Sequence, residues 1–263
     1  MKSYYRYILF FLSLLVLGCS EIRKVTDVVT NPSAREVYAR NFDKEDALYH
    51  QWQKQLELAR SNKLYLQLPS VISGQFDSVN MSAVGYTVQL EKGEELFIDA
   101  LTSVDSNLIF LELYPFVNDS LVDGKPMMAS EWNSKQLHYE IEYSGTYKIV
   151  IQAGLKNTGT YFYRIYTQPT LSFPVAGKDN AAIQSFWGAV REGGRRSHEG
   201  VDIFAARGTP VVASADGFVS FTGERGLGGK QVWLRNGLFG HSLYYAHLDS
   251  ISVGSGKRVK LGD

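Results

Sequence analysis

The sequence predicts a mainly β protein with one helical segment near its amino terminus. First, apolar residues alternate with polar ones in short runs between about residues 61 and 170, which is the period of strands with one buried face. Second, 16 tyrosines and 14 phenylalanines accompany many β-branched residues, and this composition favours strands. Third, only residues 33–60 show helical spacing. We therefore expect a helical segment, an antiparallel β-sandwich and then a carboxyl-terminal segment that carries the chemistry.

The overall composition excludes several classes of protein. The chain has 263 residues, of which 44% are hydrophobic and 21% are charged, as in folded globular proteins. Lys and Arg number 27, as do Asp and Glu, so no bulk positive field attracts nucleic acid and no such partner is expected. The single cysteine excludes an intramolecular disulfide and a CxxC metal site.

Residues 1–18 have the pattern of a secretory signal peptide. Lys2 and Arg6 precede an apolar run over residues 7–17, too short for a hydrocarbon core that needs about 20 residues. The end of the run, Val16 to Cys19, resembles the lipobox of bacterial lipoproteins. That resemblance implies cleavage before Cys19 and acylation of this cysteine. We expect a protein outside the cytoplasm, lipid-anchored to the inner or the outer membrane of the envelope.

Residues 19–60 are expected to form a tether followed by an amphipathic helix. The tether is polar and ends near Asn31-Pro32. Ser33 and Glu36 have capping-box spacing, and a stripe of apolar residues follows at helical spacing: Phe42, Leu48, Tyr49, Trp52, Leu56 and Ala59. We expect this helix to pack on the next domain, with His50 at the surface. A helix that binds a partner is the alternative.

Residues 61–170 are expected to form the β-sandwich. Turn residues separate its alternating runs, which cover 64–68, 84–90, 96–100, 108–114, 137–143, 147–151 and 161–165. Their pattern loosely resembles the pre-peptidase and jelly-roll sandwiches of secreted bacterial enzymes. We expect a packing or spacer module. Exposed aromatic side chains that stack on sugars are the alternative.

Residues 178–263 contain a candidate metal-binding pair, His198 and Asp202, in the spacing H-x-x-x-D. Gly200 and the β-branched residues that follow disfavour a helix. On a straight strand the two residues would lie about 13 Å apart, so both reach one ion only if the chain bends between them. Gly200 permits that bend. The spacing alone is a weak signal and depends on its context.

That context resembles the lysostaphin/LytM-type zinc metalloendopeptidases, which have a two-sheet β fold. The resemblance covers about residues 185–263 and rests on several fixed spacings. They are the aromatic-Gly segment from Trp187 to Arg191, Ala206–Val211, Asp216–Val219, Tyr245-Ala246-His247-Leu248, and the V-x-x-G repeat from Val253 to Gly262. We therefore expect a LytM-like β domain over residues 178–263.

The resemblance also implies residue roles. His198 and Asp202 would be two zinc ligands, and His247 would be a catalytic histidine. Arg191 would either hold the loop near the site or only pair with a carboxylate. The implied activity is hydrolysis of the peptide crosslinks of peptidoglycan by zinc-activated water.

The sequence lacks one motif of the family pattern. Members of the family carry a further H-x-H motif that completes the zinc shell, and this sequence contains no such motif. A catalytic zinc site normally has three protein ligands, so the third is missing from the sequence. We expect the sequence to be a fragment of a longer protein. The alternative is a non-catalytic LytM-like module that binds the cell wall or activates a cell-wall amidase.

Overall fold

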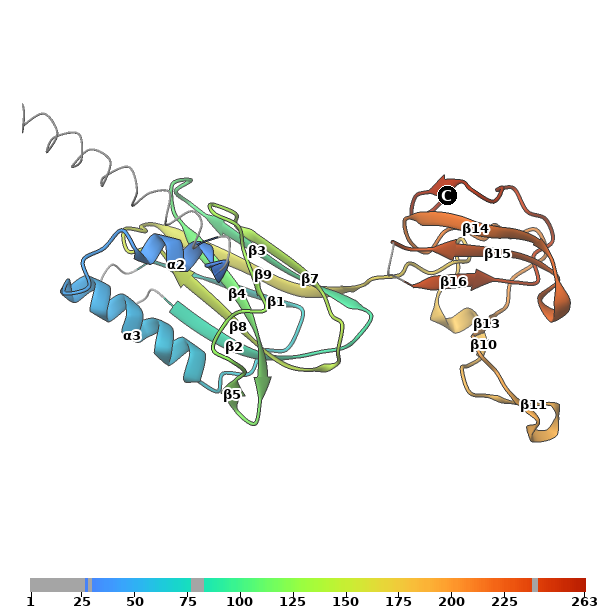
Figure 1. Cartoon of the computed structure of the whole chain (residues 1–263), viewed down its shortest axis with the longest axis horizontal. Coiled ribbons are helices and arrows are strands. Elements are labelled where there is room, and N and C mark those ends of the chain that lie inside the picture. Colours follow the sequence, from blue (N-terminus) through green and yellow to red (C-terminus); the bar gives the residue numbers. More distant parts are fainter. Residues whose placement is uncertain (1–26, 28–29, 77–82, 238–240) are drawn as a thin grey trace, which may run out of the picture. The chain divides into compact units, whose positions relative to one another are not determined.

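The structure is a computed structural model that describes residues 27, 30–76, 83–237 and 241–263. The predicted signal peptide and Cys19 lie outside these described residues. The chain divides into two compact units, Met1–Gln168 and Pro169–Asp263. Both units are built mainly from strands, which confirms the predicted fold class (Figure 1). Within the described ranges, no helix is long and apolar enough to cross a membrane.

Two helices occupy the predicted amphipathic segment, α2 (Ala34–Ala39) and α3 (Ala47–Ser61). Ser33 caps α2, and its predicted capping box with Glu36 is present. The expectation of one continuous helical stretch is wrong, because the chain turns after Arg40 and starts again at Asp46. The Asp46 carboxylate accepts a hydrogen bond from the backbone N–H of Leu48 and caps α3.

The first unit is a sandwich of two antiparallel sheets. One sheet has the order β2 (Ala83–Leu90), β8 (Gly145–Ala153), β4 (Ile109–Val117) and β5 (Ser120–Leu121), with β6 (Met128–Ala129) also paired to β4. The other has the order β1 (Ser70–Gln75), β9 (Thr160–Pro169), β3 (Glu94–Thr102) and β7 (Gln136–Glu140). Buried aliphatic side chains from both sheets form one core, among them Leu90, Leu96, Ile98, Leu111, Ile149 and Ile165.

The predicted strand at residues 64–68 is wrong. Only Tyr65 forms a bridge, parallel to Thr87 of β2, and the first strand begins at Ser70. The backbone N–H of Leu66 donates to Thr87, and that of Thr87 donates to Leu64. The pairing goes no further, and Pro69, which has no N–H to donate, precedes β1.

Helix α3 packs closely on the sheet that contains β2 and β8. Its buried residues Leu56 and Ala59 contact Tyr114 and Val150. A Cβ atom added at Gly85 of β2 would lie 1.7 Å from the carbonyl oxygen of Ala59. Gly85 therefore allows the helix backbone to touch the sheet.

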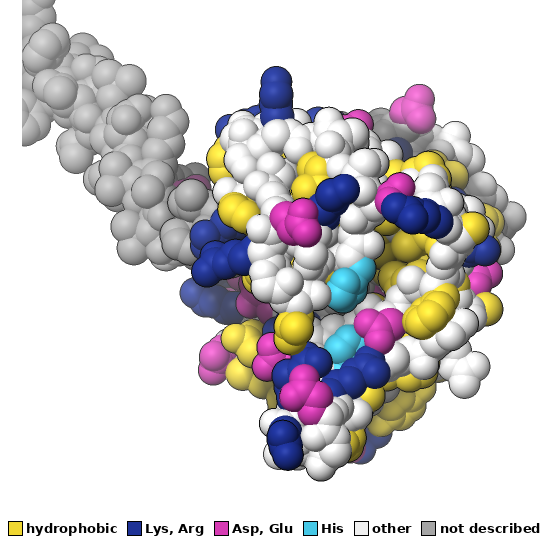
Figure 2. Space-filling model, turned by 90° about the vertical axis from the view of Figure 1, so that its right-hand side faces the viewer, with side chains coloured by type: hydrophobic (Ala, Val, Ile, Leu, Met, Phe, Trp, Pro, Cys, Tyr) yellow, Lys and Arg dark blue, Asp and Glu magenta, His cyan; other side chains and the backbone are white. Residues whose placement is uncertain are grey.

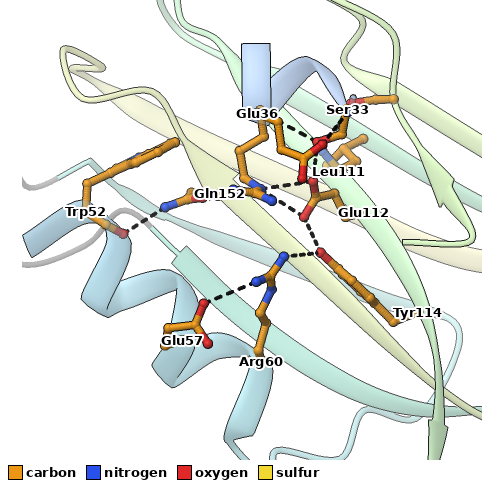
Figure 3. A network of polar contacts seen from close by, with 11 residues as sticks. Ser33, Glu36, Trp52, Glu57, Arg60, Leu111, Glu112, Tyr114 and Gln152 are labelled. Atoms are coloured by element: carbon orange, nitrogen blue, oxygen red, sulfur yellow. Dashed lines mark hydrogen bonds and ion pairs between the residues drawn. The ribbon is translucent and has the colours of Figure 1, made fainter. Parts of the chain in front are cut away.

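A polar network ties the helical segment to strand β4 (Figure 3). At its centre is Glu112, which is 1% exposed. Its carboxylate accepts hydrogen bonds from Ser33, Arg35 and Tyr114 at 2.6–3.0 Å. Arg60 of α3 in turn donates to the Tyr114 hydroxyl at 2.7 Å. Burial, followed by the charge of Glu112, raises the pKa of Tyr114 above its usual value.

The described residues of the second unit form one larger sheet and two short antiparallel strand pairs. The larger sheet has the order β16 (Ser242–Tyr245), β15 (Lys230–Arg235), β14 (Gly217–Glu224) and β17 (Arg258–Val259). The short pairs are β10 (Ile183–Ser185) with β13 (Asp202–Ile203) and β11 (Val190–Arg191) with β12 (Arg196–Ser197). A small core of Ala213, Val219 and Leu234 packs beneath the larger sheet.

Candidate metal centre

His198 and Asp202 lie next to each other in the second unit. His198 follows β12, the chain bends at Gly200, and Asp202 begins β13. The Nε2 atom of His198 is 3.2 Å from Oδ1 of Asp202. The bend thus brings together two side chains that a straight strand would keep apart.

The second oxygen of Asp202 is held by Arg191. A guanidinium nitrogen of Arg191 donates to Asp202 Oδ2 at 2.5 Å and to the Ser185 hydroxyl at 2.7 Å. Ser185 is paired with Asp202 across β10 and β13, and Arg191 ends β11. Three short strands therefore fix the orientation of one carboxylate, and its Oδ1 atom is left facing His198.

The other ring nitrogen of His198 is also held. Nδ1 lies 3.1 Å from the backbone carbonyl oxygen of Phe186 and 3.2 Å from the Ser185 hydroxyl. Arg191 lies 3.3 Å from the same nitrogen. The carbonyl can only accept, and the two hydrogens of this Arg191 nitrogen already go to Asp202 and Ser185, so we assign the proton of the neutral imidazole to Nδ1. The lone pair of Nε2 then faces a carboxylate oxygen, and these two atoms repel each other. A cation bound between them would stabilise this arrangement.

The pair fits two corners of a zinc site. Zinc–nitrogen and zinc–oxygen bonds of about 2.1 Å at a tetrahedral angle place two ligand atoms about 3.4 Å apart. The 3.2 Å between His198 Nε2 and Asp202 Oδ1 agrees with that spacing. Metal-binding histidines also usually donate their second ring N–H to a carbonyl or carboxylate. Across the residues that the structure describes, however, no group of three His, Cys, Asp or Glu side chains could hold a metal. The third ligand of a catalytic site is not among them.

His247 lies after the end of β16, with its side chain exposed. Its φ angle is 58°, and its backbone N–H donates to the carbonyl of Gly228 at 2.8 Å. In the described part of the chain, no hydrogen bond or ion pair joins it to His198 or Asp202. Figure 2 shows histidine side chains exposed at a hollowed surface, with acidic and basic side chains beside them.

The turn that follows His247 is fixed by charged side chains. Arg207 forms an ion pair with Asp249, which lowers the pKa of the Asp249 carboxyl below its usual value. Lys230 donates to the backbone carbonyl of Asp249 at 2.7 Å. The strand β15 and the loop at Arg207 therefore both hold the segment that carries His247.

Two groups around the pair were not predicted from the sequence, the Ser185 hydroxyl and the Phe186 carbonyl. A backbone carbonyl has no signature in the sequence, so Phe186 could not have been found. Ser185 lies two residues before the aromatic-Gly segment that leads to Arg191, and this position was its only signal.

Comparison with known proteins finds relatives of part of the second unit. Residues 196–263 match the model of peptidase family M23. The chain is 37% identical over 84 residues to the L-Ala–D-Glu endopeptidase of Bacillus subtilis, a match covering 32% of this chain and 26% of the relative. It is 44% identical over 61 residues to the DD-carboxypeptidase/endopeptidase Mpg of Neisseria meningitidis, covering 23% of this chain and 14% of the relative. The chain thus spans about a quarter or less of the length of these relatives.

Several solved structures also resemble part of the chain at low similarity. The pre-peptidase C-terminal domain of a collagenase from Bacillus anthracis shares 12% identity at a TM-score of 0.31, covering 41% of this chain and 96% of that domain. For the second unit, the family match and the two relatives agree with the motifs and the strands described above. Residues 196–263 are therefore similar to peptidase family M23, and this match supports the LytM-type resemblance of the sequence.

Proposed function

We propose that this protein is an envelope-anchored zinc endopeptidase that cuts the peptide crosslinks of peptidoglycan. The match to peptidase family M23 supports a peptidase. Two relatives are named for peptide bonds that involve D-amino acids, which are characteristic of peptidoglycan stems. The chain covers only a minor part of each relative, so the substrate is part of the proposal.

The convergence of His198 Nε2 and Asp202 Oδ1 at 3.2 Å carries this proposal. These two atoms would hold the zinc ion, together with a third ligand from outside the described residues. A zinc ion bound there would polarise the scissile carbonyl and lower the pKa of a bound water to about 7.

The remaining side chains have separate tasks in this proposal. Arg191 fixes the carboxylate of Asp202 through its second oxygen. The Phe186 carbonyl keeps the proton of His198 on Nδ1, so that Nε2 keeps its lone pair for coordinating the metal. His247 is exposed and would take a proton from the attacking water or give one to the leaving amine.

The proposal is tested with protein expressed from its complete gene. Zinc content is measured by mass spectrometry of the metal, and released peptides are measured by chromatography after incubation with purified peptidoglycan. We expect one zinc ion per chain and release of stem peptides. His198→Ala and Asp202→Asn should lose both zinc and cleavage. His247→Ala should lose cleavage and keep the zinc.

His50→Ala is the matched control, since His50 is an exposed histidine on α3 in the other unit. It should behave as the wild type in both measurements. If zinc-loaded protein binds peptidoglycan and releases no peptide, the proposed peptidase activity is wrong. That result would favour the alternative, a LytM-like module that binds the wall or activates an amidase.

The membrane anchor is a separate part of the proposal and has a separate test. Acylation of Cys19 would hold the protein on the outer side of a bacterial membrane. We expect the mature protein to begin at a lipid-modified Cys19, as detected by mass spectrometry, and to sediment with membranes. Cys19→Ser should release it into the soluble fraction. An unmodified amino terminus at another residue would rule out the anchor.

A further inference from the structure

An open pocket of about 550 Å³ lies on the larger sheet of the second unit. This volume is within the range of ligand sites in proteins. Strands β14, β15 and β16 supply its floor, and the turn at residues 225–228 supplies one wall. The rings of Trp233 and Tyr244 are neighbours on the floor, with centroids 4.6 Å apart, and the two residues are 38% and 46% exposed. The pocket therefore offers an apolar surface to a ligand.

The Trp233 ring is held by its own polar atom. The indole N–H donates to the side-chain oxygen of Gln231 at 3.0 Å. Gln231 is 4% exposed, and its amide nitrogen donates to the backbone carbonyl of Arg225 at 2.6 Å. The indole therefore needs no hydrogen bond from a ligand, and its ring keeps one orientation before a ligand binds.

The Tyr244 ring packs against the same turn. A Cβ atom added at Gly228 would lie 1.8 Å from the Tyr244 hydroxyl oxygen, so the glycine lets the ring reach this position. The carbonyl of Gly228 also accepts the backbone N–H of His247 at 2.8 Å. The pocket thus adjoins the segment that carries the proposed catalytic histidine.

Arg225 gives the pocket a positive charge. Among the described residues that line the pocket, it is the only charged one. Its backbone is fixed, since its N–H donates to the carbonyl of Gly229 at 3.0 Å and its carbonyl accepts from Gln231. Its side chain is exposed, and within the described ranges its guanidinium has no hydrogen bond or ion pair. A guanidinium in this state suits a carboxylate, which it binds through two parallel hydrogen bonds.

The ligand should therefore combine short aliphatic groups with a free carboxylate. In peptidoglycan the sugar carboxyl carries the stem peptide as an amide, so a substituted glycan strand offers no carboxylate. The stem peptide offers one at its second residue. This D-glutamate is joined to the third residue through its side-chain carboxyl, and its α-carboxylate stays free after crosslinking. The methylene groups of D-glutamate and the methyl group of the preceding alanine lie beside that carboxylate and suit aromatic faces.

We propose that this pocket binds the second residue of the stem peptide, with the α-carboxylate of D-glutamate on Arg225 and the neighbouring aliphatic groups on Trp233 and Tyr244. The inference rests on the proposed function, because a peptidoglycan peptidase meets this carboxylate in its substrate. The contact adds affinity beside the segment of His247. It also selects stems whose D-glutamate is not amidated, because an amide leaves the guanidinium without its counter-charge.

The test measures binding with two probes that differ in one group. The first is N-acetyl-L-Ala-γ-D-Glu-L-Lys-D-Ala amide, whose sole carboxylate is that of D-glutamate. The second has D-isoglutamine in its place and therefore no carboxylate. Both are titrated into the full protein carrying His247→Ala, so that they are not cut. Calorimetry gives the affinities, and nuclear magnetic resonance of the Trp233 indole N–H reports the site.

We expect both probes to shift the Trp233 resonance, and the acidic probe to bind about threefold to tenfold more tightly at low salt. This preference should shrink as salt is raised, because salt screens an exposed charge pair. Arg225→Gln should make the two probes bind equally, and Arg225→Lys should retain part of the preference. Arg258→Gln is the matched control, since Arg258 is exposed on β17 and does not line the pocket.

The aromatic floor is tested separately by calorimetry. Trp233→Ala should weaken both probes by about tenfold, and Trp233→Phe should retain most of the binding because a ring remains. Trp132→Ala is the control, since Trp132 is 51% exposed and lies in the other unit. Arg225→Gln changes only an exposed side chain, so the proposal can still be tested if Trp233→Ala fails to fold.

Three results would overturn the proposal. Equal binding of the two probes when Arg225 is present would show that the carboxylate is not recognised. An unchanged preference in Arg225→Gln would place the carboxylate elsewhere. If N,N′-diacetylchitobiose, a neutral sugar, shifts the Trp233 resonance while neither peptide does, the pocket is a glycan site instead.

The result is separable from the peptidase test, because it is read from binding. A protein that prefers the acidic probe through Arg225 and releases no peptide from peptidoglycan would disprove the proposed function alone. An active peptidase without this preference would disprove the inference alone.

Discussion

Arg35 donates through one nitrogen to both carboxylate oxygens of Glu112, at 2.9 and 3.0 Å. The two side chains are 6% and 2% exposed. This pair joins α2 to strand β4, which are 77 residues apart in the sequence. The helical segment is therefore attached to the sandwich by a buried charge pair as well as by the apolar contacts of α3.

Glu112→Gln keeps the shape of the side chain and removes its charge. Arg35 then stays buried without a counter-charge, and breaking such a pair costs about 3–5 kcal/mol. We expect a loss of that size in urea unfolding of the first unit. Glu57→Gln is the control, since this carboxylate is 68% exposed in its pair with Arg60 and should cost about 1 kcal/mol or less. Equal effects of the two substitutions would show that the buried pair adds nothing.

Gly85→Ala should separate α3 from the sheet. The new methyl group would overlap the carbonyl oxygen of Ala59, which belongs to the helix backbone and cannot rotate away. We expect a loss of about 2–3 kcal/mol and faster hydrogen–deuterium exchange confined to α3 and its neighbours. Gly145→Ala on β8 meets open space and should leave both measurements near wild type. Undisturbed exchange in α3 of Gly85→Ala would contradict the close packing.

The order of the elements was largely predictable because it depends on local patterns. Ser33 and Glu36 predicted the start of α2, and alternating runs predicted the strands that became β2, β3, β4, β7, β8 and β9. Glu112 shows where this reasoning stops. It stands in an apolar strand, and its partner Arg35 lies in a distant part of the sequence, so no local pattern pairs the two. The strand predicted at residues 64–68 is reduced to a single bridge for the same reason, because a local alternating pattern does not show how far a partner strand runs beside it.

Only part of the candidate metal centre was predictable from the sequence, namely the residues that follow a fixed spacing. The spacing of His198 and Asp202 and the bend at Gly200 could be inferred from the sequence. The contact of Arg191 with Asp202 depends on how β10, β11 and β13 meet, which spacing alone leaves open. The contact between the Trp233 and Tyr244 rings depends on cross-strand register, which pairs these two residues directly.

Arg191 should act as a positioning residue for the metal site. Arg191→Met leaves Asp202 Oδ2 without its donor, and loss of such a contact to a ligand typically weakens metal binding by about 10–100-fold. We expect this loss for zinc in competition with a chromophoric chelator. Arg191→Lys keeps the charge and loses the planar guanidinium, so its zinc affinity should lie between those of the wild type and Arg191→Met. Wild-type affinity in Arg191→Met would mean that the contact with Asp202 is not needed for the metal.

The second unit offers a control for that experiment. Lys260 pairs with Asp216 at 2.7 Å on the exposed surface. Lys260→Met removes a cation from a carboxylate of the same unit, and the structure gives that carboxylate no contact with His198. Zinc affinity should not change. A decrease equal to that of Arg191→Met would indicate a general effect of net charge.

Lys148 makes the stability of the first unit depend on pH. Its side chain is fully buried on β8, and its ammonium group donates to two oxygens of Asn62 and to the Thr87 hydroxyl at 2.5–3.2 Å. These partners are neutral, and burial lowers the pKa of Lys148 from 10.5 to about 8. Between these values the unfolded chain binds more protons than the folded one, so stability rises with pH. Burial raises the pKa of Tyr114 and Tyr163, which reverses the trend above about pH 10.

We therefore expect the free energy of unfolding of the first unit to increase from pH 8 to a maximum below about pH 10. Urea titrations at intervals of half a pH unit would measure it. Lys148→Met should remove the increase, because no buried ammonium group remains to lose its proton. Lys54→Met, at an exposed lysine on α3, should retain it. A stability that stays flat or falls over this range in the wild type would show that Lys148 keeps its proton in the folded protein. The oxygens of Asn62 and Thr87 would then compensate fully for its burial.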